Sequence, residues 1–295
     1  MRIKIFPFIF LFVVIFCSIA NANTLKISQN ENKIIAIAVK NKNSEPNFII
    51  DPKIRIPSDC NKIVIVTHGW VDRGKGRFAE DIASAIKSRV DANQWLCCYF
   101  EWPDGAMTIN SIASAEYARD IAGVQLAKAI VKLGNFEHIH LIGHSAGCWA
   151  IDRAAKIIEE QSKTQIHLTF LDAYVPKNWC QSDLGSLKKT KIKFIEHYYT
   201  RDVTFGVTQI NLSNACNIDI TQADPGLTEH KFPLRWYYAT ITGRYHKSDY
   251  RCGSKVYFKS DGIDYGFARS FEAGRENWEK SLMLSQAENA VKLSK

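Results

Sequence analysis

One serine in the chain lies in a setting that can make it a nucleophile. Residues 143–147, Gly-His-Ser-Ala-Gly, fit the pattern G-x-S-x-G with Ser145 at the centre. The apolar run 138–142 precedes this pattern, and the helix-like segment 148–160 follows it. A strand, a sharp turn and a helix in that order hold a serine hydroxyl clear of the backbone, and the glycines let strand and helix pass closely. We therefore expect a serine nucleophile, and the alternative is a glycine-rich turn that happens to contain serine.

A serine nucleophile needs a base, and the base needs a carboxylate that fixes its tautomer. For a serine presented in this way, the expected order along the chain is serine, acid, histidine. Asp172 follows the apolar strand-like run 166–171, and open α/β sheets place their sites at the carboxyl ends of strands. We expect Asp172 to be the acid rather than only an N-cap of the next turn. Asp202, at the end of the next apparent strand, and Asp219 remain rival acids.

Two histidines, His230 and His246, follow all three candidate acids. His230 directly precedes the helix-like segment 234–241, which is where this arrangement needs its base, so we expect His230 rather than His246 to be the base. His144 beside the serine is expected to point off the turn and to be structural. The remaining candidates lie in or at the start of strands and are also expected to be structural: His138, His140, His167 and His197.

Acyl transfer also needs donors for the oxyanion of the tetrahedral intermediate. One expected donor is the backbone N–H of Ala146, the residue after the nucleophile. The other is the N–H of Trp70, in the sequence Thr-His-Gly-Trp that ends the apolar strand-like run 62–67. Gly69 would let this loop approach the substrate closely. His68 belongs to the same motif and is not expected to be the base.

The N-terminus predicts export. Residues 1–22 combine Arg2 and Lys4, an apolar core and a final Ala-Asn-Ala, which is typical of a cleavable signal peptide. The apolar run is too short to span a bilayer comfortably. Lipidation at Cys17 is disfavoured because Phe16 stands where a small residue is expected. The mature chain is expected to begin near Asn23 and to be secreted or periplasmic.

The rest of the chain, residues 23–295, is expected to form a single domain. Apolar runs rich in β-branched residues alternate with amphipathic segments, which favours an α/β fold with a mainly parallel central sheet and helices on both faces. The stretch 202–229 is polar and irregular, and we expect a functional loop there. The expected strands are 33–39, 48–54, 62–67, 95–102, 138–142, 166–171 and 192–200, and the expected helices are 78–90, 111–133, 148–160, 234–241 and a terminal one from 277.

Charge and cysteine usage restrict the other possible partners. The formal net charge of +8 favours solubility first and contact with anionic lipid surfaces second. No nucleic-acid motif accompanies the lysines near residue 190, so nucleic acid is not expected. No cysteine or histidine spacing suggests zinc, and the chemistry requires no cofactor. Eight cysteines are present; seven follow the leader, so at least one is unpaired, and we expect it to be Cys148.

These residues together resemble the pancreatic-lipase-like group of secreted α/β-hydrolases, over about residues 62–242. The matching pieces are residues 66–70, 143–147, 171–173 and His230 with the segment 233–238. The resemblance implies the α/β-hydrolase fold and lipid or other ester substrates. It also supports Asp172, because the acid of that group follows the strand after the nucleophile strand. A loop bracketed by cysteines precedes the histidine in that group.

Cys180 and Cys216 are a loose counterpart of those two cysteines. The alternatives are that they are buried thiols or that one pairs with Cys252. The chain departs from the group at Ala146, where leucine is usual, and at Tyr174, where the turn usually contains proline. It also lacks a clear amphipathic lid, so the resemblance does not extend to interfacial activation.

Two classes of function follow. The first is a secreted serine ester hydrolase of the lipase, phospholipase A1 or carboxylesterase type. The second is a non-enzymatic lipid-binding or adhesion protein on the same fold. A thioesterase or peptidase using the same residues is a further alternative, since a triad does not determine the leaving group. A complete set of catalytic parts favours the hydrolase. Oligomeric state has no signature in the sequence.

Overall fold

The computed structural model describes residues 23–27, 35–39, 47–49, 56, 58–70, 77–189, 193–201, 207–223, 230–246, 256–260, 262–272, 278–280 and 291–292. The expected signal peptide, residues 1–22, lies outside this part of the chain, as do Asp202 and Cys252. Most of the expected terminal helix also lies outside it. Within the described residues, no helix is both long and apolar enough to span a bilayer.

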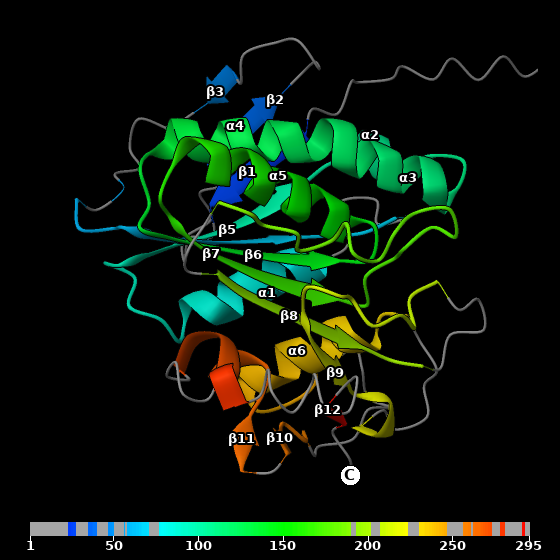
Figure 1. Cartoon of the computed structure of the whole chain (residues 1–295). Helices are drawn as coiled ribbons and strands as arrows, with labels where there is room; N and C mark the ends of the chain where they lie inside the picture. The colour runs from blue at the N-terminus through cyan, green and yellow to red at the C-terminus, as the bar shows by residue number, and fades with distance from the viewer. Residues whose placement is uncertain are drawn as a thin grey trace, which may run out of the picture.

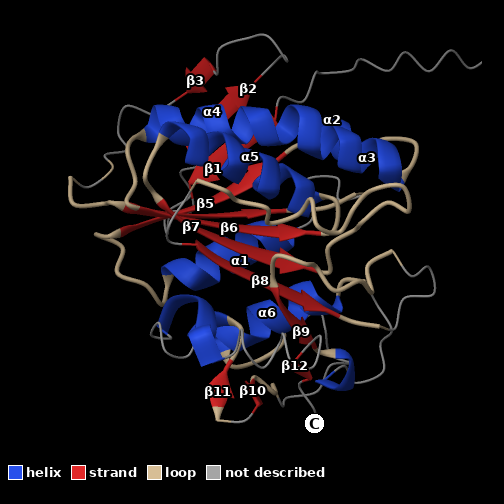
Figure 2. Ribbon diagram, viewed as in Figure 1, coloured by secondary structure: helices blue, strands red, loops and turns tan. Residues whose placement is uncertain are grey.

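In the described part of the chain, one ten-stranded sheet organises the molecule (Figures 1 and 2). Its strand order is β12-β9-β8-β7-β6-β4-β5-β1-β2-β3. The strands from β9 to β5 run parallel to one another, and β1 to β3 extend the sheet in antiparallel pairing beyond β5. The strands are β1 (Asn23–Ile27), β2 (Ile35–Val39), β3 (Asn47–Ile49), β4 (Lys62–Thr67), β5 (Trp95–Glu101), β6 (His138–His144), β7 (Gln165–Leu171), β8 (Lys193–Tyr199), β9 (Cys216–Asp219) and β12 (Val291–Lys292).

Helices cover both faces of the sheet, as Figure 1 shows. On one face lie α2 (Pro103–Ala106), α3 (Ser111–Tyr117), the π-helical segment η1 (Ala118–Ala122), α4 (Gly123–Leu133) and α5 (Gly147–Gln161). We call this the α5 face. On the other, the α6 face, lie α1 (Arg77–Lys87), α6 (Phe232–Thr242) and the short π-helical segment η4 (Ala268–Glu272).

Burial on both faces explains the amino-acid sequences of the central strands. The central strands have helices on both sides, so nearly every residue of β4 is buried, and the run is continuously apolar instead of alternating. Ile63 and Ile65 pack toward the α5 face, while Val64 and Val66 pack toward the α6 face. Consecutive side chains of a strand point to opposite faces, so a single run of β-branched residues supplies both cores.

The mainly parallel sheet with helices on both faces is what the alternation of strands and helices predicts, and the fold is the α/β-hydrolase fold that the resemblance implies. The expected strand 62–67 is found with the same bounds, and the expected helix 111–133 is found as a helix interrupted by η1. The interpretation of 202–229 as a loop is wrong in part. That stretch contains β9 and the 3-10 turn η2 (Thr221–Ala223), and β9 continues the parallel sheet beside β8.

Candidate active site

Ser145 lies on a strained turn between β6 and α5. Its φ of 54° is in the left-handed region, which few residues other than glycine adopt. Its backbone N–H donates to the carbonyl oxygen of Leu171 at 3.0 Å, which ties the turn to the next strand. A Cβ at Gly147 would collide with the carbonyl oxygen of His68, so the turn needs glycine there. The backbone therefore presents the serine in the way that the sequence pattern predicts.

The His230 ring contacts Ser145, although the two residues are 85 positions apart in the sequence. Its Nε2 lies 2.7 Å from Ser145 Oγ, and its Nδ1 lies 2.5 Å from Asp172 Oδ2. A carboxylate only accepts hydrogen bonds, so Nδ1 carries the proton and Nε2 is left to accept from the serine hydroxyl. The helix α6 starts two residues later, at Phe232, with proline in its first turn. The structure thus brings the three expected residues together in the order that proton transfer requires.

Asp172 is fully buried at the end of β7, also with a left-handed φ, 48°. Its N–H donates to the Tyr198 carbonyl oxygen at 2.8 Å, and its Oδ1 accepts from the Thr200 N–H at 3.1 Å. Burial raises the pKa of Asp172 above the usual aspartate value, while the His230 ring and the Thr200 N–H oppose that rise. Each carboxylate oxygen therefore has a donor, one from the base and one from the backbone.

His144 and His197 hold the two neighbouring turns, a role that sequence patterns do not indicate. The buried ring of His144 donates from Nε2 to the His230 carbonyl oxygen at 3.1 Å, so it anchors the backbone of the base. Burial, with His230 adjacent, lowers the pKa of His144 well below the usual histidine range, so this ring is neutral. His197 accepts the Ala173 N–H at 3.2 Å, directly after the acid. Both were expected to be structural, and both act on the site through the backbone.

The loop after β4 packs against the serine turn. A Cβ at Gly69 would lie 2.7 Å from Ser145 Cβ, so only glycine allows this approach. His68 accepts from the Trp102 N–H at 3.1 Å through Nε2, and its ring stacks on the Trp102 ring with centroids 5.0 Å apart. Ala146 caps the start of α5, where backbone N–H groups lack partners within the helix. The loop that carries Trp70 and the N-terminus of α5 therefore meet beside Ser145.

The rival residues lie elsewhere or outside the described chain. Asp219 is in β9, where its carboxylate accepts from Arg201 Nε at 2.9 Å and from the Thr221 hydroxyl at 2.6 Å. His246 Nε2 lies 3.8 Å from Asp81 Oδ2. Neither Asp219 nor His246 takes part in the hydrogen bonds of Ser145 and His230.

An exposed group of apolar side chains lies at the same edge of the sheet. Trp70 follows β4 and is 39% exposed, and Ile109 follows β5 and is 92% exposed. The Trp70 indole N–H donates to the Thr108 carbonyl oxygen at 3.1 Å, which joins the two loops. We call Trp70, Met107, Ile109 and Ile112 the apolar rim. The sequence contains an indication of the apolar rim, since Met107, Ile109 and Ile112 alternate with polar residues in the segment 107–112.

One cluster of potential metal ligands is present in the described residues, but its chemistry does not suit a metal. His140, His167 and Glu196 place ligand atoms within 4.8 Å of one another. Glu196 is already paired with the buried guanidinium of Arg269 at 2.9 Å and accepts from Ser270. Burial alone would raise the pKa of Glu196, but the His167 hydrogen bond and the Arg269 charge lower it to about 2. A metal ion would bring a second cation beside Arg269.

The described cysteines carry free thiols, so the structure shows no Cys180–Cys216 bridge, and Cys216 fits the alternative of a buried thiol. Cys216 is buried in β9 against the α6 face, whereas Cys180 is exposed in the segment that follows β7. Val175 and Leu184, on either side of Cys180, pack in the α5-face core, so the two thiols lie on opposite sides of the sheet. Cys148 is buried behind the nucleophile and donates from Sγ to the Gly143 carbonyl oxygen at 3.1 Å.

No protein family model matches the chain, and no curated protein matches it in sequence. Three solved structures are similar to it in fold. A poly(3-hydroxybutyrate) depolymerase from Bordetella parapertussis is 12% identical, with a TM-score of 0.32 over 93% of this chain and 81% of the other. ESTFA in an iron-lacking apo form is 15% identical, with a TM-score of 0.29 over 88% and 82%. An arylesterase is 12% identical, with a TM-score of 0.30 over 89% and 83%. Likeness at this level carries no argument, and the chemistry of the site rests on its geometry.

Proposed function

We propose that the protein is a serine hydrolase of carboxylic esters, with Ser145 as nucleophile, His230 as base and Asp172 as orienting acid. The observation that carries the proposal is the pair of hydrogen bonds made by one histidine, 2.7 Å to Ser145 Oγ and 2.5 Å to Asp172 Oδ2. A serine hydroxyl is a weak nucleophile until a base accepts its proton. Here the base has its accepting nitrogen on the serine and its donating nitrogen on a buried carboxylate.

The reaction has two halves. Ser145 Oγ attacks the ester carbonyl carbon as its proton passes to His230 Nε2, and the tetrahedral intermediate expels the alcohol, which takes that proton. Water then gives a proton to His230 and attacks the acyl–serine ester, which releases the carboxylic acid and restores the Ser145 hydroxyl. Asp172 stays ionised and stabilises the imidazolium that forms in each half.

The oxyanion is assigned to two backbone N–H groups, those of Ala146 and Trp70. Ala146 supplies the N-terminal end of α5, where the helix dipole favours negative charge. Trp70 is carried by the loop whose Gly69 packs against Ser145 Cβ. Donors that are already oriented in the folded protein stabilise developing charge without further rearrangement. The mechanism uses no metal or organic cofactor.

The apolar rim supports an apolar ester, or a lipid surface that presents one. Exposed Met107 and Ile109 flank Thr108, whose carbonyl oxygen accepts from the indole N–H of Trp70, the residue that carries a proposed oxyanion donor. An exposed apolar group next to a reactive serine is suited to an acyl chain or to the interface of a lipid aggregate. Together with the signal peptide that the sequence predicts at residues 1–22, this supports a lipase-like esterase that acts outside the cytoplasm. The resemblance to the pancreatic-lipase-like group points to the same substrates.

A fluorophosphonate probe tests the chemistry directly. We expect it to label the wild-type protein and the Ser88→Ala control, and not to label Ser145→Ala. Purified wild-type protein should hydrolyse p-nitrophenyl esters in a panel of graded acyl length from acetate to laurate, and Ser145→Ala should not. A non-enzymatic binding protein would give neither signal. Faster cleavage of thioesters or peptides than of esters would move the assignment to the alternative hydrolase classes.

A pair of surface variants tests the apolar rim. Ile109→Ser should reduce the hydrolysis of emulsified or vesicle-bound long-chain esters and leave that of soluble short-chain esters nearly unchanged. Val131→Ser is the matched control, because Val131 is also an exposed apolar residue but lies on α4. Equal effects of the two variants on vesicle-bound esters would contradict the role of the apolar rim.

A further inference from the structure

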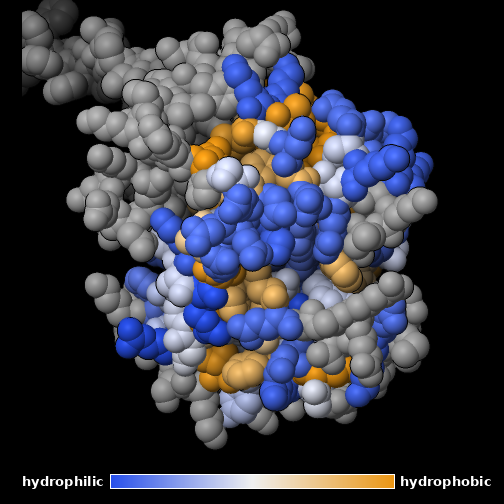
Figure 3. Space-filling model, turned by 90° about the vertical axis from the view of Figure 1, so that its left-hand side faces the viewer, coloured by the Kyte–Doolittle hydropathy of each residue, from blue (hydrophilic) through white to orange (hydrophobic). Residues whose placement is uncertain are grey.

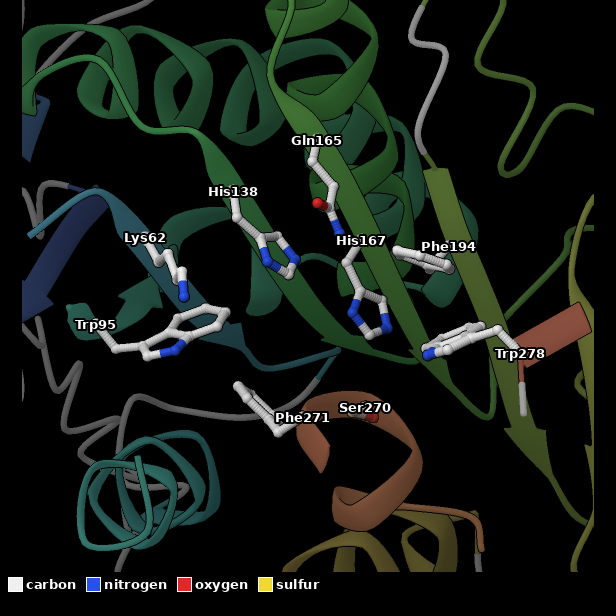
Figure 4. Close-up of a pocket in the computed structure, with 9 residues that line it drawn as sticks. All are labelled: Lys62, Trp95, His138, Gln165, His167, Phe194, Ser270, Phe271 and Trp278. Carbon is white, nitrogen blue, oxygen red and sulfur yellow. The ribbon is translucent and has the colours of Figure 1, made fainter. Parts of the chain in front are cut away.

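A pocket lies at the opposite end of the parallel strands from Ser145. It has a volume of about 280 Å³ (Figure 4). Lys62, Trp95, His138 and Gln165 line it, and they are the first residues of β4, β5, β6 and β7. Ser145 follows the last residue of β6, so the length of that strand, about 20 Å, separates it from the pocket. The pocket is therefore independent of the proposed active site.

Strand register places the polar side chains of this pocket side by side. Lys62 pairs with Trp95 on one side and with His138 on the other, and His138 pairs with Gln165. Paired residues of neighbouring strands point to the same face. Farther along the same face β4 is apolar, with Val66 in the α6-face core, whereas β6 and β7 continue with the buried polar residues His140 and His167. A covered parallel sheet is ordinarily apolar throughout. The buried polar residues deeper on this face are satisfied by one another through Glu196, which binds His167 and Arg269, but Lys62 and His138 at the strand ends lie outside that network.

Aromatic rings form the two sides of the pocket. Trp95 meets Phe271 at a centroid distance of 5.3 Å on one side, and Phe194 meets Trp278 at 4.5 Å on the other. Figure 4 shows these pairs flanking His138 and His167. Ring walls of this kind fit the flat apolar body of an aromatic molecule.

The polar groups of the pocket favour an anion. Among the described residues, the lining contains the Lys62 ammonium and no carboxylate. Lys62 Nζ donates to Gln94 Oε1 at 2.9 Å, and an ammonium has further protons to donate. Burial, with His167 and Lys62 nearby, lowers the pKa of His138 to about 3, so its ring is neutral and can donate from one nitrogen. The buried Nε2 of His138 has no hydrogen-bond partner within the described chain.

The surface around this end agrees with such a site. Figure 3 views the molecule from the side where the parallel strands begin, and among the residues coloured there hydrophilic ones predominate, with apolar residues between them. A ligand with a charged group and an aromatic ring would match both the hydrophilic and the apolar residues on this side.

We propose that this pocket binds a small flat aromatic monocarboxylate, with its ring between the two aromatic pairs and its carboxylate on Lys62 Nζ and the His138 ring. Sodium benzoate is the simplest probe of this chemistry. Benzyl alcohol has a similar size without the charge, and benzylamine has the opposite charge. We expect benzoate to bind with a Kd of about 1 mM, since a ligand of this size gains a limited free energy. Both analogues should bind at least about tenfold more weakly.

Titration calorimetry and the indole N–H signals of the protein in NMR provide the test. Lys62→Gln should weaken benzoate binding by about tenfold, since it removes a charged hydrogen-bond donor at a partly exposed position. Lys62→Arg should restore most of the affinity, and the matched control Lys128→Gln on α4 should not change it. Melting temperatures verify that each variant is folded, and the analogue comparison on wild-type protein needs no variant. No binding at about 10 mM benzoate, equal binding of benzyl alcohol, or unchanged affinity in Lys62→Gln would overturn the proposal.

Discussion

Replacing Asp172 with asparagine tests how the acid controls the base. Oδ1 of Asp172 accepts from the Thr200 N–H at 3.1 Å, and Oδ2 faces His230 Nδ1 at 2.5 Å. An asparagine that keeps the Thr200 hydrogen bond must place its NH₂ group against His230 Nδ1. That group only donates, so Nδ1 must accept and the ring proton moves to Nε2. A protonated Nε2 cannot accept the proton of Ser145.

The structure also sets the size of the effect. Turning the amide over restores the correct histidine tautomer, but it leaves the buried Thr200 N–H facing another donor. An unsatisfied buried donor costs about 1–3 kcal/mol, which corresponds to roughly 5- to 150-fold in the population of the working arrangement. The variant also lacks the negative charge that stabilises the imidazolium. Together we expect kcat/KM to fall by about 10³- to 10⁴-fold.

Initial rates with a soluble p-nitrophenyl ester measure this loss. Asp219→Asn is the matched control, because Asp219 is also a buried strand-end carboxylate but binds Arg201 and Thr221. It should change kcat/KM by less than about threefold, as expected for an uncoupled position. Asp202→Asn should likewise cost far less than Asp172→Asn. A loss of less than tenfold in Asp172→Asn, or a larger loss in either other variant, would refute the reasoning.

Three further expectations follow from specific contacts. Gly69→Ala would place a Cβ 2.7 Å from Ser145 Cβ, so kcat should fall by about 10- to 100-fold in ester assays while the protein remains folded. Burial lowers the pKa of His197 to about 4, below the unfolded value near 6.5, so the unfolded state takes up a proton first on acidification. Stability should therefore fall between pH 6.5 and pH 4, by about 2 kcal/mol at pH 5 from this residue, and urea titrations of His197→Gln should show a shallower dependence. Arg269→Met leaves Glu196 buried without its cation, so urea unfolding should show a loss of about 3–5 kcal/mol.

Local patterns in the sequence predict the catalytic end of the sheet well. The buried strands β4 and β6 are continuous apolar runs, and the turn at Ser145 needs glycines that the sequence displays. Asp172 is recognisable because it directly follows an apolar strand. His230 is recognisable because it precedes α6. In each case the signal lies within a few residues of the group that it identifies.

Contacts between distant segments could not be predicted in the same way. β9 has only four residues, Cys216 to Asp219, and its register comes from pairing with β8. Cys180 and Cys216 bracket a loop in the sequence, but the sheet separates them, and only the three-dimensional arrangement shows this. The anchoring of His230 by His144 uses a backbone carbonyl, which has no signature in the sequence.

The backbone at the two strand ends restricts which chemistries could evolve on this scaffold. Ser145 has a φ of 54° and Asp172 a φ of 48°. A β-branched side chain is a severe outlier at such angles, so threonine cannot occupy position 145. Cysteine is unbranched at Cβ and can occupy it. Position 172 suits aspartate or asparagine, the non-glycine residues that tolerate this conformation best. A lineage of this protein could therefore reach a thiol nucleophile in one substitution, but it could not exchange its acid for glutamate without rebuilding the turn.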